Sequence, residues 1–517
     1  MRHFTLSIVA LIALASNAQP GSLDPTFGNN GKVLVPSLGA GLDDQSVTAV
    51  MLPDDKILVA GRSSNGVHFN SVLLRFNADG TPDLTFGTDG LVEHDLGGGS
   101  EFIRSAALDG QGRLVVGGQL FSDPSETNSD MFVARFLSDG SLDPSFGGTG
   151  LIVRDLHTTP DAEEAHEVLV QPDGKIVLCG FTGPSLEFTE IVVERYLENG
   201  GLDPSFGGDG SVLAFISNGS GEQVRGAVLG PNGDIYFCGY VIPLGESEQA
   251  ILLGRVDAEG DSPSDFGNNN GHTSVPMNGS NLIARTVALM PEGRLVVAGA
   301  KRTPGASQAR FIYTFDAVGD GSFSRFQDNP DGGDAWNSLL VQNDGAVIAG
   351  GNEADGPDSR NWDVERFIDS DLIVDGGFES VDYDEDGGEE TCFDMEFTSD
   401  GSIIGIGDAQ VAGVRRIVLL KYLNDISTEV AEGTSSPMVS AFPNPTSDNT
   451  TITLNDVKTA AVDLTLSDAA GRVLRQWTQQ MDQGSSFKID LADLSPGVYS
   501  VGVESGVHTS TLKLIVQ

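Results

Sequence analysis

The chain has 517 residues, with 74 aspartates and glutamates against 29 lysines and arginines, a formal net charge of −45. This charge repels nucleic acid and anionic membranes at long range, which excludes nucleic acid as a partner and favours solubility in a salty medium over selection of a basic partner or a divalent cation. The length predicts two or three units, and 66 glycines spread singly along the chain predict many short strands joined by turns.

Residues 1–18 have the pattern of a signal peptide. Arg2 precedes an apolar run over residues 4–15, and a small-x-small cleavage site ends at Ala18. We therefore expect cleavage between Ala18 and Gln19 and a secreted chain, with a buried N-terminal helix as the alternative. The run is too short to span a bilayer, and no other apolar stretch is longer, so the sequence predicts no transmembrane segment.

Residues 19–423 repeat themselves with a period close to 60. A loop of the type Leu-Asp-Pro-Ser-Phe-Gly occurs at 142–147 and 202–207, with variants elsewhere. Its phenylalanine recurs in five consecutive steps of 59 or 60 residues and a last step of 52. The seven positions are Phe27, Phe86, Phe146, Phe206, Phe266, Phe326 and Phe378.

Two further motifs share this period and also occur seven times. One is a tight turn followed by an apolar run, clearest at 172–180. The other is an alternating strand that ends in a basic–aromatic pair such as Arg135-Phe136. Four short strands fit into one period, which is typical of a propeller blade, whereas a solenoid rung rarely needs that many. The sequence therefore predicts an all-β chain whose main part is a seven-bladed β-propeller.

The phase of the repeats predicts how the ring closes. The chain enters the array with a strand at 32–37 that precedes any complete repeat, and it leaves after a strand at 416–422 that no fourth strand follows. We expect these two segments to pair and to complete the seventh blade, because that pairing removes the exposed edges of an open array.

The repeats resemble the delta-60 repeat family of bacterial secreted proteins. That pattern reads Leu-Asp-x-x-Phe-Gly, then Gln-Pro-Asp-Gly-Lys-Ile, then Ala-Arg-Tyr-x-x-Asp-Gly, and the likeness covers residues 21–423. The best copies lie at 132–147 and 171–207, and copies five to seven are degraded. Because the family has no general assigned activity, the resemblance implies a fold and no reaction.

Candidate chemistry is sparse. The basic positions of the third motif could form an anion site, but each precedes an aspartate by eight residues in the best copies, which favours a structural ion pair; they are Arg75, Arg135, Arg195, Arg255, Arg366 and Lys421. The repeated phenylalanines are interpreted as packing between blades. The three cysteines, Cys179, Cys238 and Cys392, match no zinc motif and are expected to be reduced core residues. No histidine motif or nucleophile elbow occurs, so we predict no catalytic residue, no cofactor and no metal ligand apart from one acidic loop.

That loop is Asp382-Tyr-Asp-Glu-Asp-Gly-Gly388. Its alternating carboxylates, Asp382, Asp384 and Asp386, match the first half of a calcium loop, but the twelfth position is Phe393 instead of glutamate. Calcium and a solvated acidic loop remain the two interpretations.

The tail follows a linker over residues 424–438 and changes in pattern. About seven short strands in residues 439–517 predict a small β-sandwich. The tail resembles the type A sorting domain of the type IX secretion system of Bacteroidetes. The matching residues are Phe442, Pro443, Asn444, Pro445, Gly471, Pro496, Gly497, Tyr499 and Lys513.

By this resemblance, the tail directs passage across the outer membrane, and a sortase-like peptidase removes it and attaches the chain to the cell surface. The partners expected are this machinery and an unknown extracellular ligand, a glycan or a protein. The function expected is a surface-displayed binding propeller; the alternative is a hydrolase or lyase acting on polysaccharide, with its site on one propeller face.

Overall fold

The computed structural model is all-β throughout the part of the chain that it describes. The described residues are 19–39, 42–121, 126, 128–156, 162–185, 188–214, 221–243, 245–267, 270–306, 308–327, 333–354, 360–368, 372–378, 383, 388–424, 439–442, 449–454, 460–468, 473–481, 486–491, 494, 497–505 and 508–516. Within these ranges no helix is long and apolar enough to cross a bilayer. Residues 1–18 and the three aspartates of the acidic loop lie outside them.

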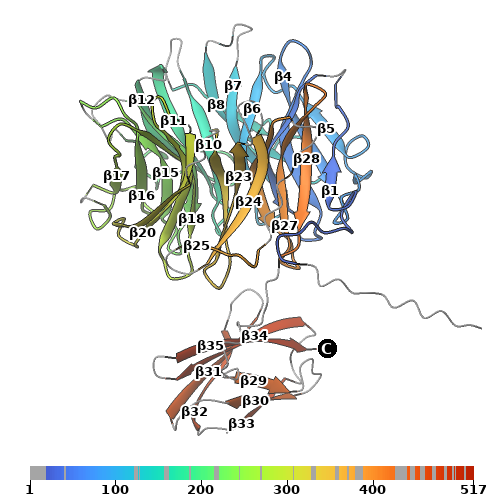
Figure 1. Cartoon of the computed structure of the whole chain (residues 1–517), viewed down its shortest axis with the longest axis vertical. Coiled ribbons are helices and arrows are strands. Elements are labelled where there is room, and N and C mark those ends of the chain that lie inside the picture. The colour runs from blue at the N-terminus through green and yellow to red at the C-terminus, as the bar shows by residue number, and fades with distance from the viewer. Residues whose placement is uncertain are drawn as a thin grey trace, which may run out of the picture. The chain divides into compact units, whose positions relative to one another are not determined.

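Seven antiparallel sheets of four strands form a seven-bladed β-propeller, as the repeat predicts (Figure 1). Six blades use consecutive strands. These are β2–β5 (Asp44–Met51, Ile57–Ser64, Phe69–Phe76, Leu91–His94), β6–β9 (Glu101–Leu108, Leu114–Phe121, Ser129–Phe136, Leu151–Arg154), β10–β13 (Glu164–Val170, Ile176–Ser185, Phe188–Tyr196, Ser211–Ala214), β14–β17 (Glu222–Leu229, Ile235–Val241, Ala250–Val256, His272–Val275), β18–β21 (Asn281–Leu289, Leu295–Arg302, Gln308–Phe315, Gly321–Gln327) and β22–β25 (Ala335–Val341, Val347–Ala354, Arg360–Ile368, Ile373–Val374).

The seventh blade combines both ends of the repeat array. Its strands β26 (Glu390–Phe397), β27 (Ile403–Val411) and β28 (Val414–Tyr422) are followed in space by β1 (Lys32–Leu34). Lys32 pairs with Leu420 and Leu34 with Val418, and the Val35 amide continues the ladder to the Ile417 carbonyl at 2.9 Å. Figure 1 shows β1, in blue, beside β28, in orange.

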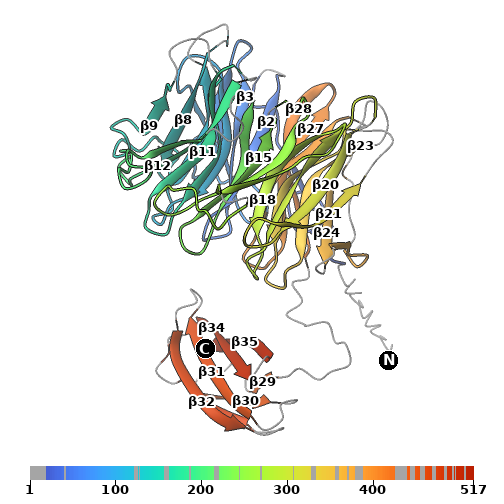
Figure 2. The same cartoon turned by 90° about the vertical axis from the view of Figure 1, so that its left-hand side faces the viewer.

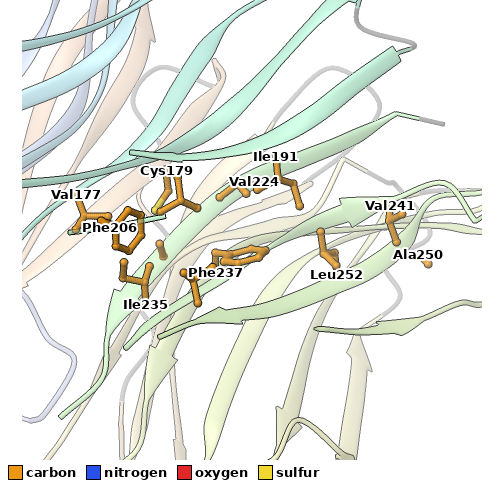
Figure 3. Close-up of a cluster of buried hydrophobic side chains, with 13 residues drawn as sticks. Val177, Cys179, Ile191, Phe206, Val224, Ile235, Phe237, Val241, Ala250 and Leu252 are labelled. Carbon is orange, nitrogen blue, oxygen red and sulfur yellow. The ribbon is translucent and has the colours of Figure 1, made fainter. Parts of the chain in front are cut away.

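Apolar clusters fill the spaces between neighbouring blades. The cluster in Figure 3 joins the third and fourth blades, with Cys179 and Ile191 from one facing Val224 and Phe237 from the other. Equivalent clusters lie between the other blades, and the one between the seventh and first contains Val35 together with Ile417. Cys179, Cys238 and Cys392 are buried and free of disulfides, which agrees with their predicted place in the core.

The arginine of the basic–aromatic motif bonds both to the outer loop of its own blade and to a backbone carbonyl of the next blade. Arg135 Nε donates to Asp143 at 2.8 Å, its guanidinium lies 4.8 Å from the centroid of Phe146, and its Nη1 donates to the Glu198 carbonyl one blade further on. Arg75 and Arg195 repeat the arrangement with Asp83 and Asp203. The structural ion pair is therefore confirmed, and these cations are committed to the outer part of the blades.

The tail forms a separate unit, because contacts divide the chain after residue 425. One sheet contains β29 (Val439–Phe442), β30 (Asn449–Leu454) and β33 (Ser486–Asp490), and the other contains β32 (Val473–Met481), β31 (Ala460–Asp468), β34 (Gly497–Ser505) and β35 (His508–Val516) (Figure 2). Leu464 and Ile489, one from each sheet, are buried, and the rings of Trp477 and Phe487 lie 5.7 Å apart.

Candidate functional site

The first strand of each blade lines a cavity at the centre of the propeller. Each of these strands contacts the first strand of the next blade, and β2 contacts β26, which closes the ring. The cavity has a volume of about 410 Å³, and its lining includes residues of all seven first strands. It is therefore the place where side chains distant in sequence come together.

Every first strand carries one β-bulge at the same height, and the extra residue lines the cavity. A bulge places two residues opposite one on the partner strand and re-aims a side chain. All seven extra residues are half-buried. We call them the bulge ring: Val47, Arg104, His166, Arg225, Arg285, Asn337 and Phe393.

A glycine on the second strand faces each bulge. In the third blade Gly180 pairs with Ala165, just before the bulge, and a Cβ on Gly180 would overlap the Glu164 carbonyl oxygen. The same overlap with the first strand is found at all seven positions, so the bulge requires glycine there. The glycines are Gly61, Gly118, Gly180, Gly239, Gly299, Gly351 and Gly407.

The bulge ring has two arcs of different chemistry. Polar or cationic residues occupy five consecutive blades, from Arg104 in the second to Asn337 in the sixth. The remaining two neighbouring blades contribute the apolar side chains of Phe393 and Val47. A ligand in this cavity would therefore meet cationic groups on one side and apolar groups on the other.

We call the five polar or cationic positions, from Arg104 to Asn337, the cationic arc. Within this arc, Arg104 and His166 both lie next to the carboxylate of Glu164. Arg104 Nε forms an ion pair with Glu164, and His166 Nε2 lies 3.3 Å from the same Glu164 oxygen. Arg225 Nη1 lies 3.0 Å from His166 Nε2. A guanidinium only donates, so the bond from Arg225 needs an unprotonated Nε2, whereas the Glu164 oxygen beside the same atom favours a protonated one. Burial, with Arg225 close by, lowers the pKa of His166 to about 4, so the ring is neutral at pH 7.

Arg285 completes the cationic arc without a carboxylate. Its Nη1 donates to the side-chain oxygen of Asn337, and Asn337 Nδ2 in turn donates to the Cys392 carbonyl at 2.8 Å. Burial, and then the nearness of other arginines with Arg225 foremost, lowers the pKa of Arg285 to about 10. This direction is that of a cation in a positive environment.

The residues after the bulges form a second layer that joins the blades. The Val168 amide donates to Ser105 Oγ at 3.2 Å, and the Ala49 amide donates to Asp394 at 3.2 Å, each across a blade boundary. Glu167 occupies the equivalent position and accepts a hydrogen bond from Ser105. Burial raises the pKa of Glu167 to about 8 and raises that of Asp394 as well. We interpret this layer as structural.

The residues predicted from sequence lie elsewhere. In the tail, Phe442 ends β29, Gly497 and Tyr499 lie on β34, and Lys513 on β35 pairs with Ser500. Gln19 is described at the predicted cleavage site, where its carbonyl accepts a bond from the Ser22 amide at 3.0 Å. The other predicted residues fall outside the described ranges: Ala18, Pro443, Asn444, Pro445, Gly471, Pro496 and the acidic-loop residues Asp382, Asp384 and Asp386. Throughout the described ranges, no three histidine, cysteine or carboxylate side chains are grouped to hold a metal ion.

The sequence interpretation missed the bulge ring. Its members follow no motif, since the same place in the repeat holds valine, arginine, histidine, asparagine or phenylalanine. A signal was nevertheless available, because an isolated glycine inside a strand suggests a bulge. The glycine that ends the apolar run of the turn motif, as in 172–180, is that residue.

Two family models match the chain. Residues 440–517 match the secretion system C-terminal sorting domain. Residues 52–86, 112–146 and 171–206 match the domain of unknown function (DUF5122) beta-propeller. The tail is thus a sorting domain of type IX secretion, which directs export and attachment at the outer cell surface, and the repeats are of this propeller family.

Several solved structures resemble the chain at low identity. Polysaccharide lyase Uly1 is 11% identical, with 79% of this chain and 93% of that chain covered and a TM-score of 0.44. A protein of unknown function from Dyadobacter fermentans is 12% identical, with 77% and 100% covered and a TM-score of 0.40. A mutant Trypanosoma rangeli sialidase with trans-sialidase activity is 9% identical, with 96% and 90% covered and a TM-score of 0.35. No curated protein matches the sequence.

Proposed function

We propose that this chain, a propeller exported with a type IX sorting domain, is a cell-surface binding protein whose ligand enters the central cavity. The observation that carries the proposal is the bulge ring. Seven identical backbone features present side chains of five different kinds to one cavity of about 410 Å³.

The contrast between the ring and its glycines supports a ligand. The glycine opposite the bulge is the same in all seven blades, because the backbone geometry demands it. The bulge residue itself differs from blade to blade although every one is at the same height. The arginine–aspartate pairs of the outer loops, which hold the fold, recur in the best copies of the repeat, whereas the bulge residues differ from blade to blade and line the cavity.

A polysaccharide-active enzyme is the second candidate, because a histidine and a carboxylate, His166 and Glu164, lie 3.3 Å apart beside the cavity. Their partners favour binding. The Nε2 atom that would remove a proton lies within 3.3 Å of both Arg225 and Glu164, and Glu164 is held by Arg104. Incubating the chain with polysaccharides and measuring new reducing ends or unsaturated products tests this candidate.

The binding function is tested with glycan and protein arrays and a substitution that fills the cavity. The chain from Gln19 to Gln517 is probed as wild type, as Val47→Trp, which places an indole in the ring, and as Leu84→Trp. Leu84 is 71% exposed on the loop between β4 and β5 and serves as the control. We expect ligands that wild type and Leu84→Trp retain and Val47→Trp loses. Equal retention by all three folded proteins would place binding outside the cavity.

A further inference from the structure

We infer that the ligand of this cavity carries an anionic group, a carboxylate or sulfate on a ring-sized body, and that Arg225 and Arg285 bind that group. The inference rests on the proposed binding function and specifies its ligand class. Arg225 and Arg285 lie on the first strands of neighbouring blades, β14 and β18, and both line the cavity.

Carboxylates are abundant in this chain. Acidic residues outnumber basic ones by 74 to 29, so an arginine that the fold uses for its own stability has carboxylates available. The outer-loop arginines illustrate this, since Arg75, Arg135 and Arg195 each hold an aspartate within 2.8 Å. Arginines whose side-chain bonds go only to neutral groups are a minority here. Arg62, which donates to Gln45, and Arg325, which donates to the Leu372 carbonyl, are two of them, and neither lines the cavity.

Arg225 and Arg285 belong to the same minority. Arg225 donates to His166 and Gln223, and Arg285 donates to Asn337. His166 is neutral at pH 7, so none of these partners is an anion. In the described part of the chain neither guanidinium forms an ion pair with a carboxylate within 4.0 Å. Glu164, which already pairs with Arg104, attracts Arg225 from beyond ion-pair distance. A half-buried cation without a directly paired counter-charge costs free energy, and an anionic ligand would recover that cost.

Glu164 determines where along the arc the anion goes. It is buried at 7% exposure and pairs with Arg104, so the second and third blades already contain a negative charge. The fourth and fifth blades, with Arg225 and Arg285, contribute no carboxyl group to the cavity lining, whereas the third blade contributes Glu167 and the seventh contributes Asp394. The excess negative charge of the surface does not prevent binding, because physiological salt screens charges beyond about 8 Å.

The opposite arc indicates what else the ligand has. Phe393 and Val47 face the cavity from the two blades across the ring. A fully hydrated inorganic ion would leave these side chains without a partner. A ligand with an apolar face, such as the ring of a sugar acid or an aromatic carboxylate, would cover them while its acid group faces the arginines.

Calorimetric titration of the Gln19–Gln517 chain tests the inference with three probes: glucuronate, benzoate and uncharged glucose. The variants are Arg285→Gln, which removes the charge, Arg285→Lys, which keeps it, and Arg294→Gln as the control. Arg294 belongs to the hairpin between β18 and β19 and pairs with the exposed Glu292. Thermal unfolding of each variant establishes that it is folded.

We expect at least one of the two acids to bind, glucose not to bind, and Arg285→Gln to weaken acid binding about tenfold or more, the value of one charge-assisted hydrogen bond. Arg285→Lys is expected to lose less, and Arg294→Gln nothing. Equal acid binding by Arg285→Gln overturns the inference. The inference is also overturned if the array ligand whose binding Val47→Trp abolishes is uncharged, although that result would leave the binding function intact. If Val47→Trp changes no binding at all, binding lies outside the cavity, and the proposed function of the cavity fails together with the inference.

Discussion

Single glycines on the second strands determine where the cavity acquires its side chains. At Gly180, a Cβ would overlap the carbonyl oxygen of Glu164 and approach the Cα of Ala165. Both are backbone atoms and cannot turn aside, unlike a flexible side chain. The glycine therefore permits the bulge, and the bulge turns His166 toward the cavity. This dependence makes the glycine a residue of the site although it touches no ligand.

Gly180→Ala is expected to destabilise the propeller by about 1–3 kcal/mol, the usual cost of overpacking. Gly110→Ala is the matched control, since nothing lies within 4 Å of a Cβ at Gly110. Urea unfolding followed by tryptophan fluorescence measures both. The two variants should differ clearly in midpoint; equal midpoints would mean that the first strand shifts at no cost, contrary to the packing described.

Glu167 gives the stability of the propeller a pH dependence of predictable sign. Its pKa is raised from 4.5 to about 8 by burial, so between these values the folded chain keeps a proton that the unfolded chain releases. Stability that is present below pH 4.5 is therefore lost as the pH rises toward 8. Asp394 faces Glu167 across the layer, and its pKa is raised too, which contributes a loss of the same sign.

Glu167→Gln should reduce this loss without abolishing it, because Asp394 remains. Unfolding free energies at pH 5, 7 and 9 should fall less in the variant than in the wild type, with the largest gain at pH 9. Exposed Glu246 supplies the control substitution Glu246→Gln, which should follow the wild type at every pH. A variant that loses stability as steeply as the wild type would show that Glu167 titrates normally.

At the scale of strands, the sequence predicted the outer parts of the blades better than their centre. Turn residues recur where hairpins form: Gly174, for example, adopts a φ of 84° in the turn before β11. The phase of the repeats pointed to a pairing of the first and last strands, and β1 does pair with β28. The bulges were missed although a glycine on the second strand marks each one, because a bulge is a property of two paired strands and the side chain that it turns inward follows no repeat.

The sequence could not predict the cationic arc for a further reason. Its members are separated by about 60 residues each and come from different blades, so no local spacing brings Arg104, Arg225 and Arg285 together. The basic residues that do repeat, those of the third motif, are the ones with structural partners. In this chain the repeated motifs identify residues that hold the fold, and the bulge residues follow no such motif.

Removing β1 should open the seventh blade. Val33 and Val35 belong to the cluster between the seventh and first blades, and Leu34 packs into the cluster between the sixth and seventh. Val35 is buried, and Val33 and Leu34 are half-buried. A fully buried side chain of this size contributes about 1.5–3 kcal/mol and a half-buried one less, against a net stability of about 5–15 kcal/mol for a domain. A chain starting at Leu38 is therefore expected to aggregate or to melt far below one starting at Gln19.

A circular permutant provides the control for this truncation. Moving residues 19–37 behind Tyr422 through a short linker restores the fourth strand, and it should restore the thermal midpoint. Scanning calorimetry compares the three chains. A Leu38 chain that melts like the Gln19 chain would show that β1 contributes little to holding the ring closed.

At the scale of the whole molecule, charge separates the surface from the cavity. The chain carries a net charge of −45, yet the lining of the central cavity contains three arginines and only two carboxyl groups, Glu167 and Asp394, and burial raises the pKa of both carboxyls. An acidic exterior keeps a displayed protein soluble and away from other anionic surfaces. A cationic cavity inside such an exterior admits small anions, while large polyanions such as nucleic acid meet the acidic surface first.

Because the propeller and the tail are separate units, we expect loss of the tail to affect export of the chain and not folding of the propeller. Each blade cluster lies within residues 19–424, and the tail has buried residues of its own, such as Leu464 and Val501. Deleting Val439 to Gln517 should therefore leave a folded propeller, with an unchanged thermal midpoint, that has lost its sorting signal. We expect this truncated chain to collect in the periplasm and the full chain to reach the cell surface.

An epitope tag in an exposed loop, at Val67, which is 78% exposed, follows both chains in the same cells. Antibody binding to intact cells and fractionation of the periplasm locate them, and replacing the deleted tail by the sorting domain of another exported protein should restore surface display. Because the substituted tail shares only the sorting signal, its success would separate that signal from any contribution of the tail to the propeller's stability. Surface display of the tailless chain would show instead that the propeller itself carries what the secretion machinery recognises.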